Sequence, residues 1–353
     1  MTQTRQWMIA AILTISGTLN LSAQKIQTVD HDGRPIAFAH VMNAEGTLLG
    51  VTDQDGILSD VQGAKTLHIT HVTCKPRVIQ TTDIHDGRII LDDADFNLPE
   101  ITVTPKDWLY IETYYRVAII QNHNELLFFG EGIYDNYIDL NSKKPWNDYH
   151  HPVKQHYAAK KLYNLLFWAS YSNHCMPPLH PAVRKGGKVT AQTYTNGRAD
   201  LIAEGKKVGY ATIDSDKRHV TLDLLNYVNA VGTEKKKKEA QHITEVNDNA
   251  KSYFYDVYHV DADGNAGIED FIMLQWATHG VMKKTDAPVD ILIMTYATDH
   301  AYLSKKEKST FKKARKENQI TPAQLTNYAH NHGVPPIDAA LQAKITQLKH
   351  TPQ

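Results

Sequence analysis

The sequence has 353 residues, of which 42% are hydrophobic and 22% are charged, and its formal net charge is −1. This balance excludes a chain that is disordered throughout, because enough apolar surface is available to offset the loss of chain entropy. It also argues against nucleic acid as a partner, since no strong field would attract a polyanion. At this length we expect about two domains.

Residues 1–23 are predicted to be a secretory signal peptide. Arg5 precedes the apolar run WMIAAILTISGTLNL, and SAQ follows it, which is the charged, apolar and small-residue order of a cleaved signal. Polar residues interrupt the run, and it is shorter than the ~20 residues that span a bilayer. We therefore expect cleavage after Ala23 and no transmembrane segment in the mature chain.

Residues 24–104 are predicted to form an all-β sandwich of antiparallel strands. Short β-prone runs alternate with turn signals every ~8–12 residues, as sandwiches do. At Asp32-Gly33, Asp55-Gly56 and Asp86-Gly87, glycine can supply positive φ while the aspartate caps the turn. The expected strands are KIQTV, IAFAHVMN, TLLGVT, KTLHITHV, RVIQTT, RIILD and EITVT.

This segment resembles the carboxypeptidase-like regulatory domain, a transthyretin-like sandwich. The family pattern is a Val-x-Asp-x-x-Gly-x-Pro-Ile turn, a small residue and Val, and a Thr-Asp-x-x-Gly turn. The matching residues are Val29, Asp30, Gly33, Pro35, Ile36, Ala39, Val41, Thr52, Asp53 and Gly56. Where the family usually has Gly-Tyr or Gly-Phe, this chain has Thr73-Cys74.

The resemblance implies a folded accessory module without catalytic residues. In this family the module occurs beside peptidase domains and at the N-terminus of outer-membrane transporters and other surface proteins. It implies an exported protein located in the periplasm or at the outer membrane, rather than one released from the cell.

Residues 105–353 are predicted to form an α+β domain with an antiparallel sheet, because hairpins and terminal helices occur without βαβ alternation. Trp108, Ile111 and Tyr115 have helical spacing, so we expect a helix over 106–118. Further helices are expected over 153–171, 301–317, 321–330 and 336–348, and strands or hairpins over 125–140, 186–225, 251–276 and 290–298.

The run from Tyr115 to Tyr137 is similar to sequence that follows the regulatory module in uncharacterised bacterial envelope proteins. The likeness implies no activity. The residues that carry it are Tyr115, Arg116, Glu131, Gly132, Tyr134 and Tyr137.

Two histidine-rich stretches hold the candidate metal ligands, since neutral imidazole is a common ligand. DYHHPVKQH contains His150, His151 and His156, and NHCMPPLH contains His174, Cys175 and His180. In a chain with 19 histidines, we expect both groups to be ordinary surface or half-buried residues and predict no cofactor.

Three other motifs are interpreted as non-functional. His242 and Glu245 have the His-x-x-Glu spacing of carboxypeptidases, but they lack supporting context. The loop Asp261–Gly267 suggests calcium but fits a hairpin turn better, because its sixth and twelfth positions are wrong for an EF-hand. Cys74 and Cys175 would enter an oxidising compartment, where they could form one disulfide or remain buried thiols.

Two surfaces are candidates for binding. The segment Ser304–Asn318 has seven Lys and Arg against two Glu and is expected to be a solvated helix that could meet an acidic polymer or lipid headgroups. Tyr134, Tyr137, Trp146 and Tyr149 would suit a peptide or glycan surface, although most are expected in the core.

These observations favour a non-enzymatic envelope protein with a binding or assembly role. Its expected partner is an envelope protein, a peptide or a glycan. The alternative is an envelope hydrolase, metal-dependent or not, with its site in the C-terminal domain and His150, His151 or His156 as its candidate residues.

Overall fold

The computed structural model describes residues 25–94, 106–141, 147–160, 175–177, 189–214, 216–223, 226–227, 230, 251–261, 266–281 and 286–349. The described chain divides into two compact units. The smaller contains residues 25–71 and 77–92, and the larger contains residues 72–76 and those from 93 onward. The predicted signal peptide and the expected strand EITVT lie outside the described residues.

The smaller unit is built from two sheets of short strands. Six of its expected strands are confirmed, and β4 is an additional one. One expectation is wrong, because β1 pairs with β7 in parallel rather than antiparallel. The sheets have the orders β4-β1-β7 and β3-β2-β5-β6. The strands are β1 (Ile26–Val29), β2 (His40–Asn43), β3 (Leu48–Val51), β4 (Ile57–Leu58), β5 (Thr66–His71), β6 (Cys74–Gln80) and β7 (Arg88–Ile90), although the first three residues of β6 are grouped with the larger unit.

The turns of this unit have the predicted chemistry. The Oδ1 atom of Asp30 accepts from the backbone N–H groups of Asp32 and Arg34, and Gly33 follows at a φ of +77°. Asp53 caps the second turn in the same way, with Gly56 at +72°. A side chain at Gly56 would also meet the Thr28 carbonyl oxygen at 2.4 Å, so only glycine fits there.

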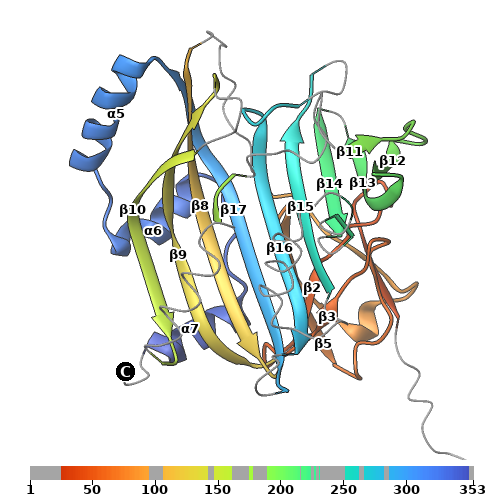
Figure 1. The fold of residues 1–353 in the computed structure, drawn as a ribbon. Coiled ribbons are helices and arrows are strands. Elements are labelled where there is room, and N and C mark those ends of the chain that lie inside the picture. Colours follow the sequence, from red (N-terminus) through yellow and green to blue (C-terminus); the bar gives the residue numbers. More distant parts are fainter. Residues whose placement is uncertain are drawn as a thin grey trace, which may run out of the picture. The chain divides into compact units, whose positions relative to one another are not determined.

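The larger unit contains one sheet of ten antiparallel strands, in the order β10-β9-β8-β17-β16-β15-β14-β13-β12-β11 (Figure 1). This confirms the expected antiparallel sheet. The strands are β8 (Trp108–Gln121), β9 (Glu125–Asp139), β10 (Asn147–Ala158), β11 (Val189–Ala191), β12 (Arg198–Ala203), β13 (Lys206–Asp214), β14 (Lys217–Asp223), β15 (Lys251–His259), β16 (Phe271–Val281) and β17 (Pro288–Leu303).

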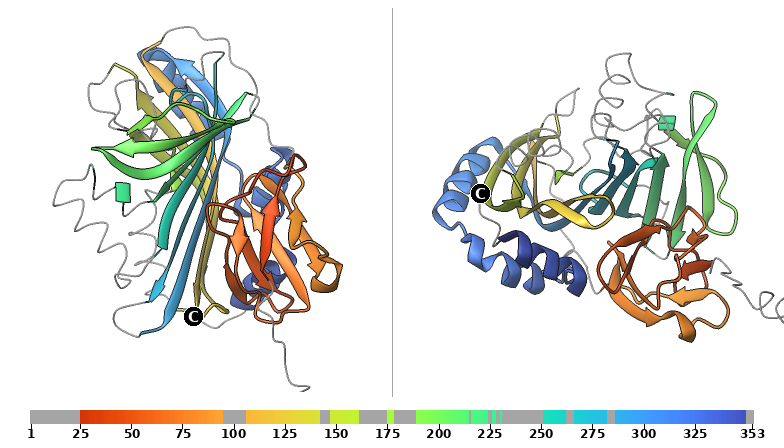
Figure 2. Two further views of the ribbon diagram at one scale, coloured as in Figure 1. Left: turned by 90° about the vertical axis from the view of Figure 1, so that its right-hand side faces the viewer. Right: turned by 90° about the horizontal axis from the view of Figure 1, so that it is seen from below.

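Three α-helices follow the last strand, where helices were predicted. They are α5 (Lys305–Glu317), α6 (Leu325–Asn331), preceded by the short helix η3 (Pro322–Gln324), and α7 (Ala339–Lys349). Seen from below in the right-hand view of Figure 2, they lie along one side of the sheet, against the part made by β8, β9 and β10. No helix in the described part of the chain is long and apolar enough to cross a membrane.

Two helix predictions are wrong. Residues 108–121 form strand β8, and residues 153–158 belong to strand β10. In β8 both faces are covered, since Leu109 to Tyr115 are all buried. A strand buried on both faces has apolar residues at nearly every position, so helical spacing occurs in it by coincidence. Of the rest of the helix expected up to Tyr171, only residues 159 and 160 are described.

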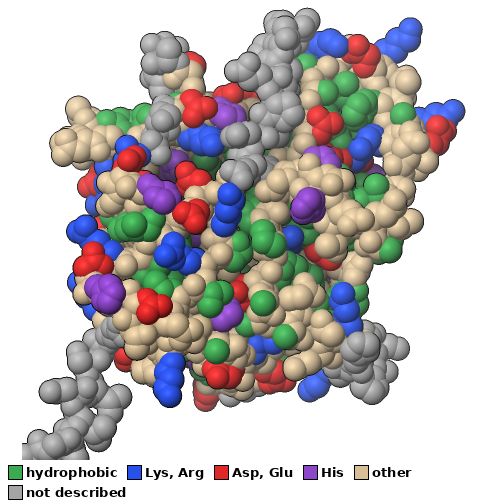
Figure 3. All heavy atoms as spheres, turned by 180° about the vertical axis from the view of Figure 1, so that it is seen from behind, with side chains coloured by type: hydrophobic (Ala, Val, Ile, Leu, Met, Phe, Trp, Pro, Cys, Tyr) green, Lys and Arg blue, Asp and Glu red, His purple; other side chains and the backbone are tan. Residues whose placement is uncertain are grey.

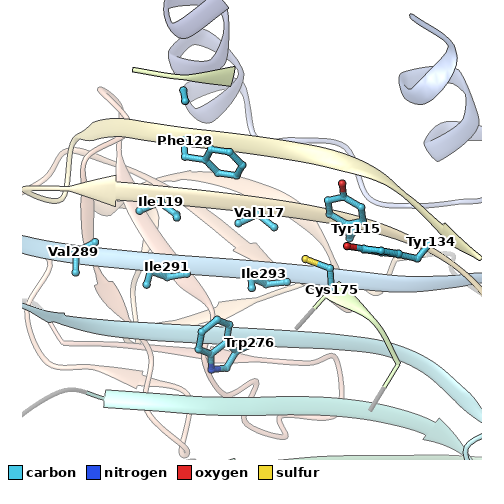
Figure 4. Packing of buried hydrophobic residues seen from close by; sticks show 11 residues of the cluster. Tyr115, Val117, Ile119, Phe128, Tyr134, Cys175, Trp276, Val289, Ile291 and Ile293 are labelled. Atoms are coloured by element: carbon cyan, nitrogen blue, oxygen red, sulfur yellow. The ribbon is translucent and has the colours of Figure 1, made fainter. Parts of the chain in front are cut away.

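One core cluster of the larger unit lies on the sheet face opposite the helices (Figure 4), and a smaller one, around Tyr110, Tyr137 and Leu303, packs against Phe311 of α5. In the larger cluster, side chains from β8, β9, β10, β16 and β17, together with Cys175, pack around Trp276, which is fully buried. Its members are Tyr115, Val117, Ile119, Phe128, Tyr134, Ala158, Cys175, Trp276, Val289, Ile291 and Ile293.

Candidate functional site

A pocket of about 500 Å³ lies where α6, α7 and the segment between them meet β8 and β9. This volume is within the range of about 300–1,000 Å³ that is usual for small-molecule sites. Phe129, Ala329, Val334 and Ile345 are buried and supply apolar walls. The remaining lining residues are Arg116, Glu131, Thr326, His330, Pro336, Ile337, Gln342 and Lys349.

The polar end of the pocket is formed by Arg116 and Glu131, which are direct cross-strand neighbours on β8 and β9. Tyr114 joins them: its hydroxyl donates to Glu131 at 2.6 Å and accepts from Arg116 Nε at 3.1 Å. Arg116 Nη1 donates to the carbonyl oxygen of Pro335 at 2.5 Å. These bonds fix the guanidinium plane, and Nη2 donates to no atom of the described chain, so its donors can reach a ligand.

The rim of the pocket adds positive charge. Thr326, His330, Gln342 and Lys349 are exposed lining residues of α6 and α7. Lys349 also lies over the ring of Tyr157, 4.9 Å from its centroid. With Arg116 and Lys349 against the single carboxylate of Glu131, the lining carries one excess positive charge when His330 is neutral.

Beside the pocket, two buried carboxylates share one guanidinium. Glu112 and Asp135 are paired across β8 and β9 and are 3% and 1% exposed. Arg315 of α5 reaches both, with its Nη2 2.9 Å from Asp135 Oδ1. Tyr110 donates to Asp135 at 2.8 Å, and Tyr328 of α6 donates to Glu112. Burial raises the pKa of Asp135 to about 6, although the hydrogen bond from Tyr110 acts in the opposite direction.

The basic segment Ser304–Asn318 forms α5, but it is not simply a solvated helix. Lys308, Lys312 and Arg315 lie on the face that meets the sheet, and Asp148 of β10 pairs with both lysines. Lys308 also lies 3.0 Å from the centroid of the Trp108 ring. The basic charge that suggested an external acidic partner is therefore partly neutralised within the protein. On the face seen in Figure 3, basic and acidic side chains are interspersed.

The structure divides the first histidine group. His150 points toward Asp135, with its Nδ1 3.8 Å from Oδ2, on the helix-covered face of the sheet. His151 and His156 are on the opposite face, where their Nε2 atoms lie 2.8 Å and 3.3 Å from the Tyr115 hydroxyl. Burial lowers the pKa of His151 to about 3, so its imidazole is neutral at ordinary pH.

The remaining candidates are not brought together. Cys175 belongs to the core cluster beside Tyr115 and Tyr134, whereas His174 and His180 lie outside the described residues. Among the described residues, no three His, Cys, Asp or Glu side chains form a metal-binding group. Cys74 and Cys175 are both buried and form no disulfide. His242, Glu245 and most of the loop Asp261–Gly267 also lie outside the described residues.

The aromatic residues are mostly structural. Tyr134 and Tyr137 are 2% and 0% exposed, so they belong to the core, whereas Tyr149 is 50% exposed. Trp146 lies outside the described residues. The peptide or glycan surface expected from these residues is therefore reduced to Tyr149 in the described chain.

Sequence reasoning missed the pocket, because its polar residues come from β8 and β9 and its walls come from helices about 200 residues later. The only available signal was that charged residues, Arg116 and Glu131 among them, occur inside strands that are largely apolar. A charged residue in a doubly covered strand needs a partner or a cavity, and here Tyr114 and the pocket supply them.

Comparison with known proteins assigns no family. No family model matches the sequence, and no curated protein is similar to it. Lipovitellin, solved in a study of lipid–protein interactions, has 10% sequence identity and a TM-score of 0.27, with 69% of this chain and 35% of that chain covered. A double mutant of the vaccine antigen transferrin binding protein B from Haemophilus parasuis Hp5 has 9% identity and a TM-score of 0.19, with 81% of this chain and 42% of that chain covered.

The chain thus spans less than half the length of either structure. Structural similarity this low carries no argument about the function of the chain.

Proposed function

We propose that this chain is a non-enzymatic binding protein of the cell envelope, and that its larger unit binds one small amphipathic acid in the pocket behind β8 and β9. The observation that carries the proposal is the pocket itself, which combines buried apolar walls with the oriented guanidinium of Arg116. An apolar ligand body would replace water along Phe129 and Ile345. A carboxylate, sulfonate or phosphate would accept charge-assisted hydrogen bonds from Arg116 Nη2, with Lys349 close to the same opening.

Binding is favoured over catalysis by the state of the polar groups. Tyr114 and Pro335 hold Arg116, and Tyr114 donates to Glu131, so both charged groups are fixed in place. Hydrolysis would need a nucleophile activated by a base within hydrogen-bond reach. Among the described lining residues, no such pair is hydrogen-bonded.

The proposal for the whole chain keeps the expected architecture. Residues 24–104 would be a carboxypeptidase-like regulatory module with a transthyretin-like sandwich, and residues 105–353 an α+β domain. The capped glycine turns after Asp30 and Asp53 support the first assignment, since these residues carry the family pattern. Export by the signal at residues 1–23 would place the protein in the periplasm or at the outer membrane, where the module could meet an envelope partner.

The experiment is a fluorescence titration of the purified chain with anilinonaphthalene sulfonate, an apolar fluorophore with one acidic group. Thr326→Trp would place a large ring in the pocket opening. Asn327→Trp adds the same ring at the next, also exposed, position of α6, which does not line the pocket. It therefore controls for the effect of a new tryptophan.

We expect saturable binding of one dye per chain, weakened at least tenfold in Thr326→Trp and unchanged in Asn327→Trp. Unfolding by urea must be alike in both variants. Equal affinities in all three proteins, or an absence of saturable binding, would contradict the proposal.

A further inference from the structure

On the sheet face opposite the pocket, two imidazoles converge on one phenol oxygen. The Nε2 atoms of His151 and His156 lie 2.8 Å and 3.3 Å from the hydroxyl oxygen of Tyr115. Tyr115 is fully buried, and both histidines are half-buried. Three donor atoms of types that bind metals therefore lie around one point.

An irregularity in β10 creates this convergence. His151 and His156 are five residues apart, so in a regular strand they would project to opposite faces. The register shifts between His150 and Val153: three steps along β10 match two steps along β9. This extra residue brings His151 to the face of His156 and leaves His150 on the other face. Bulges of this kind often re-aim a side chain at a functional site.

Two glycines in β9 make room for the group. A Cβ at Gly132 would be 2.7 Å from the Tyr115 hydroxyl oxygen and 2.5 Å from the Val153 carbonyl oxygen. A Cβ at Gly130 would be 3.0 Å from Cδ2 of His156. The rings therefore lie directly over the strand, and any other residue would displace them. The ring of Tyr134 stacks on the ring of His151, with centroids 4.4 Å apart and an angle of 14° between the planes.

We propose that Tyr115, His151 and His156 bind one divalent transition-metal ion of the zinc type. In tetrahedral zinc sites the bonds are about 2.0–2.1 Å, which places neighbouring donor atoms about 3.3 Å apart. The distance to His156 Nε2, 3.3 Å, has this value, and the His151 ring, at 2.8 Å, must move about 0.5 Å away from the phenol oxygen to admit the ion. Imidazole nitrogen suits zinc and copper, and a phenolate would add an anionic oxygen ligand.

Binding exchanges a proton for the metal. The Tyr115 O–H bond breaks, an oxygen–metal bond forms, and the proton goes to solvent, while the two neutral imidazoles donate lone pairs without losing protons. One proton is therefore released for each ion bound. The fourth position is left to water or another donor.

The test is isothermal titration of the purified chain with zinc chloride at pH 8, in two buffers of different ionisation enthalpy. The comparison of buffers measures the protons released. Cobalt(II) absorption then reports the coordination geometry. The variants are Tyr115→Phe, which keeps the buried ring, and His156→Gln. The matched control is His219→Gln, because His219 also bonds a tyrosine hydroxyl, that of Tyr255 at 2.6 Å, on strands β14 and β15 rather than on β8 and β10.

We expect one tight zinc equivalent with release of about one proton, and intense tetrahedral cobalt bands. Tyr115→Phe should abolish the proton release and weaken zinc binding at least tenfold. His156→Gln should weaken it similarly, and His219→Gln should leave it unchanged. Equal zinc affinity in wild type and Tyr115→Phe, or an equal loss in the His219 control, would overturn the proposal, as would an absence of binding by a folded wild-type chain. The pocket is on the other face of the sheet, so this result is independent of ligand binding there.

Discussion

Two buried aspartates show how the surroundings of a single residue set its charge. Asp135 and Asp290 are both 1% exposed. Burial dominates at Asp135 and raises its pKa to about 6. At Asp290, burial acts in the same direction, but hydrogen bonds from His279 at 2.6 Å and His123 at 2.9 Å outweigh it and lower the pKa. The two residues therefore contribute to stability in opposite pH ranges.

The folded state holds the proton of Asp135 more tightly than the unfolded chain does, so this group favours folding less as pH rises from about 4 to about 6. Asp290 favours folding above the unfolded pKa of about 4, and this contribution is lost as pH falls through its lowered pKa. We expect Asp135→Asn to remove pH dependence between about 4 and 6, and Asp290→Asn to remove it below about 4. Urea unfolding at a series of pH values measures both, and identical profiles for the two variants would contradict the assignment.

At the scale of the element, α5 shows why a charge count misleads. Its start was predictable, because Ser304 and Glu307 form a capping box. The sequence did not predict that some of its basic side chains would face the sheet rather than the solvent. Lys308, Lys312 and Arg315 recur at the spacing of one helix face, and that face meets Asp148, Glu112 and Asp135. Those carboxylates come from strands more than 150 residues earlier, so local sequence could not pair them.

Replacing Arg315 should therefore affect stability far more than replacing an exposed cation of the same helix. Arg315→Met leaves two buried carboxylates without their guanidinium, which we expect to cost about 3 kcal/mol at pH 7. Lys313→Met, at a side chain that is 81% exposed, should cost less than about 0.5 kcal/mol. Denaturant midpoints give both values.

A second change separates charge from packing at the same site. Adding Asp135→Asn to Arg315→Met removes one of the unneutralised charges and should restore part of the lost stability. Lowering the pH toward 5 should have the same effect on Arg315→Met, because protonation neutralises a carboxylate with a raised pKa. If neither restores stability, the loss comes from side-chain packing instead.

Strand β8 shows the limit of pattern recognition within one element. Covered on both faces, it reads WLYIETYYRVAII and has no alternation that would separate a strand from a buried helix. By contrast, the hairpins of β12 to β13 were predictable from Glu204-Gly205, which take φ values of +49° and +73° in the turn. The hairpin marked by turn residues was therefore predicted correctly, whereas the strand covered on both faces was mistaken for a helix.

For the molecule as a whole, the sequence predicted the antiparallel sheet and the three C-terminal helices. It did not predict either site. The pocket joins β8 and β9 to α6 and α7, and the histidine pair depends on an extra residue in β10 beside Pro152, which is typical of bulges but does not by itself show which side chains a bulge brings together. Both depend on tertiary placement of residues whose local patterns are ordinary.

Calorimetric titration with decanoic acid and decanol shows whether the pocket selects an amphipathic acid. The two ligands share an apolar chain and differ in the acidic group, so their affinities separate burial from charge. We expect the acid to bind at least tenfold more tightly to the wild-type chain, since a charge-assisted hydrogen bond contributes about 1.5–3 kcal/mol. Lys349→Gln should reduce this preference without changing the affinity for decanol. Equal binding of the acid and the alcohol, or binding of neither, would rule out an acid-selective pocket.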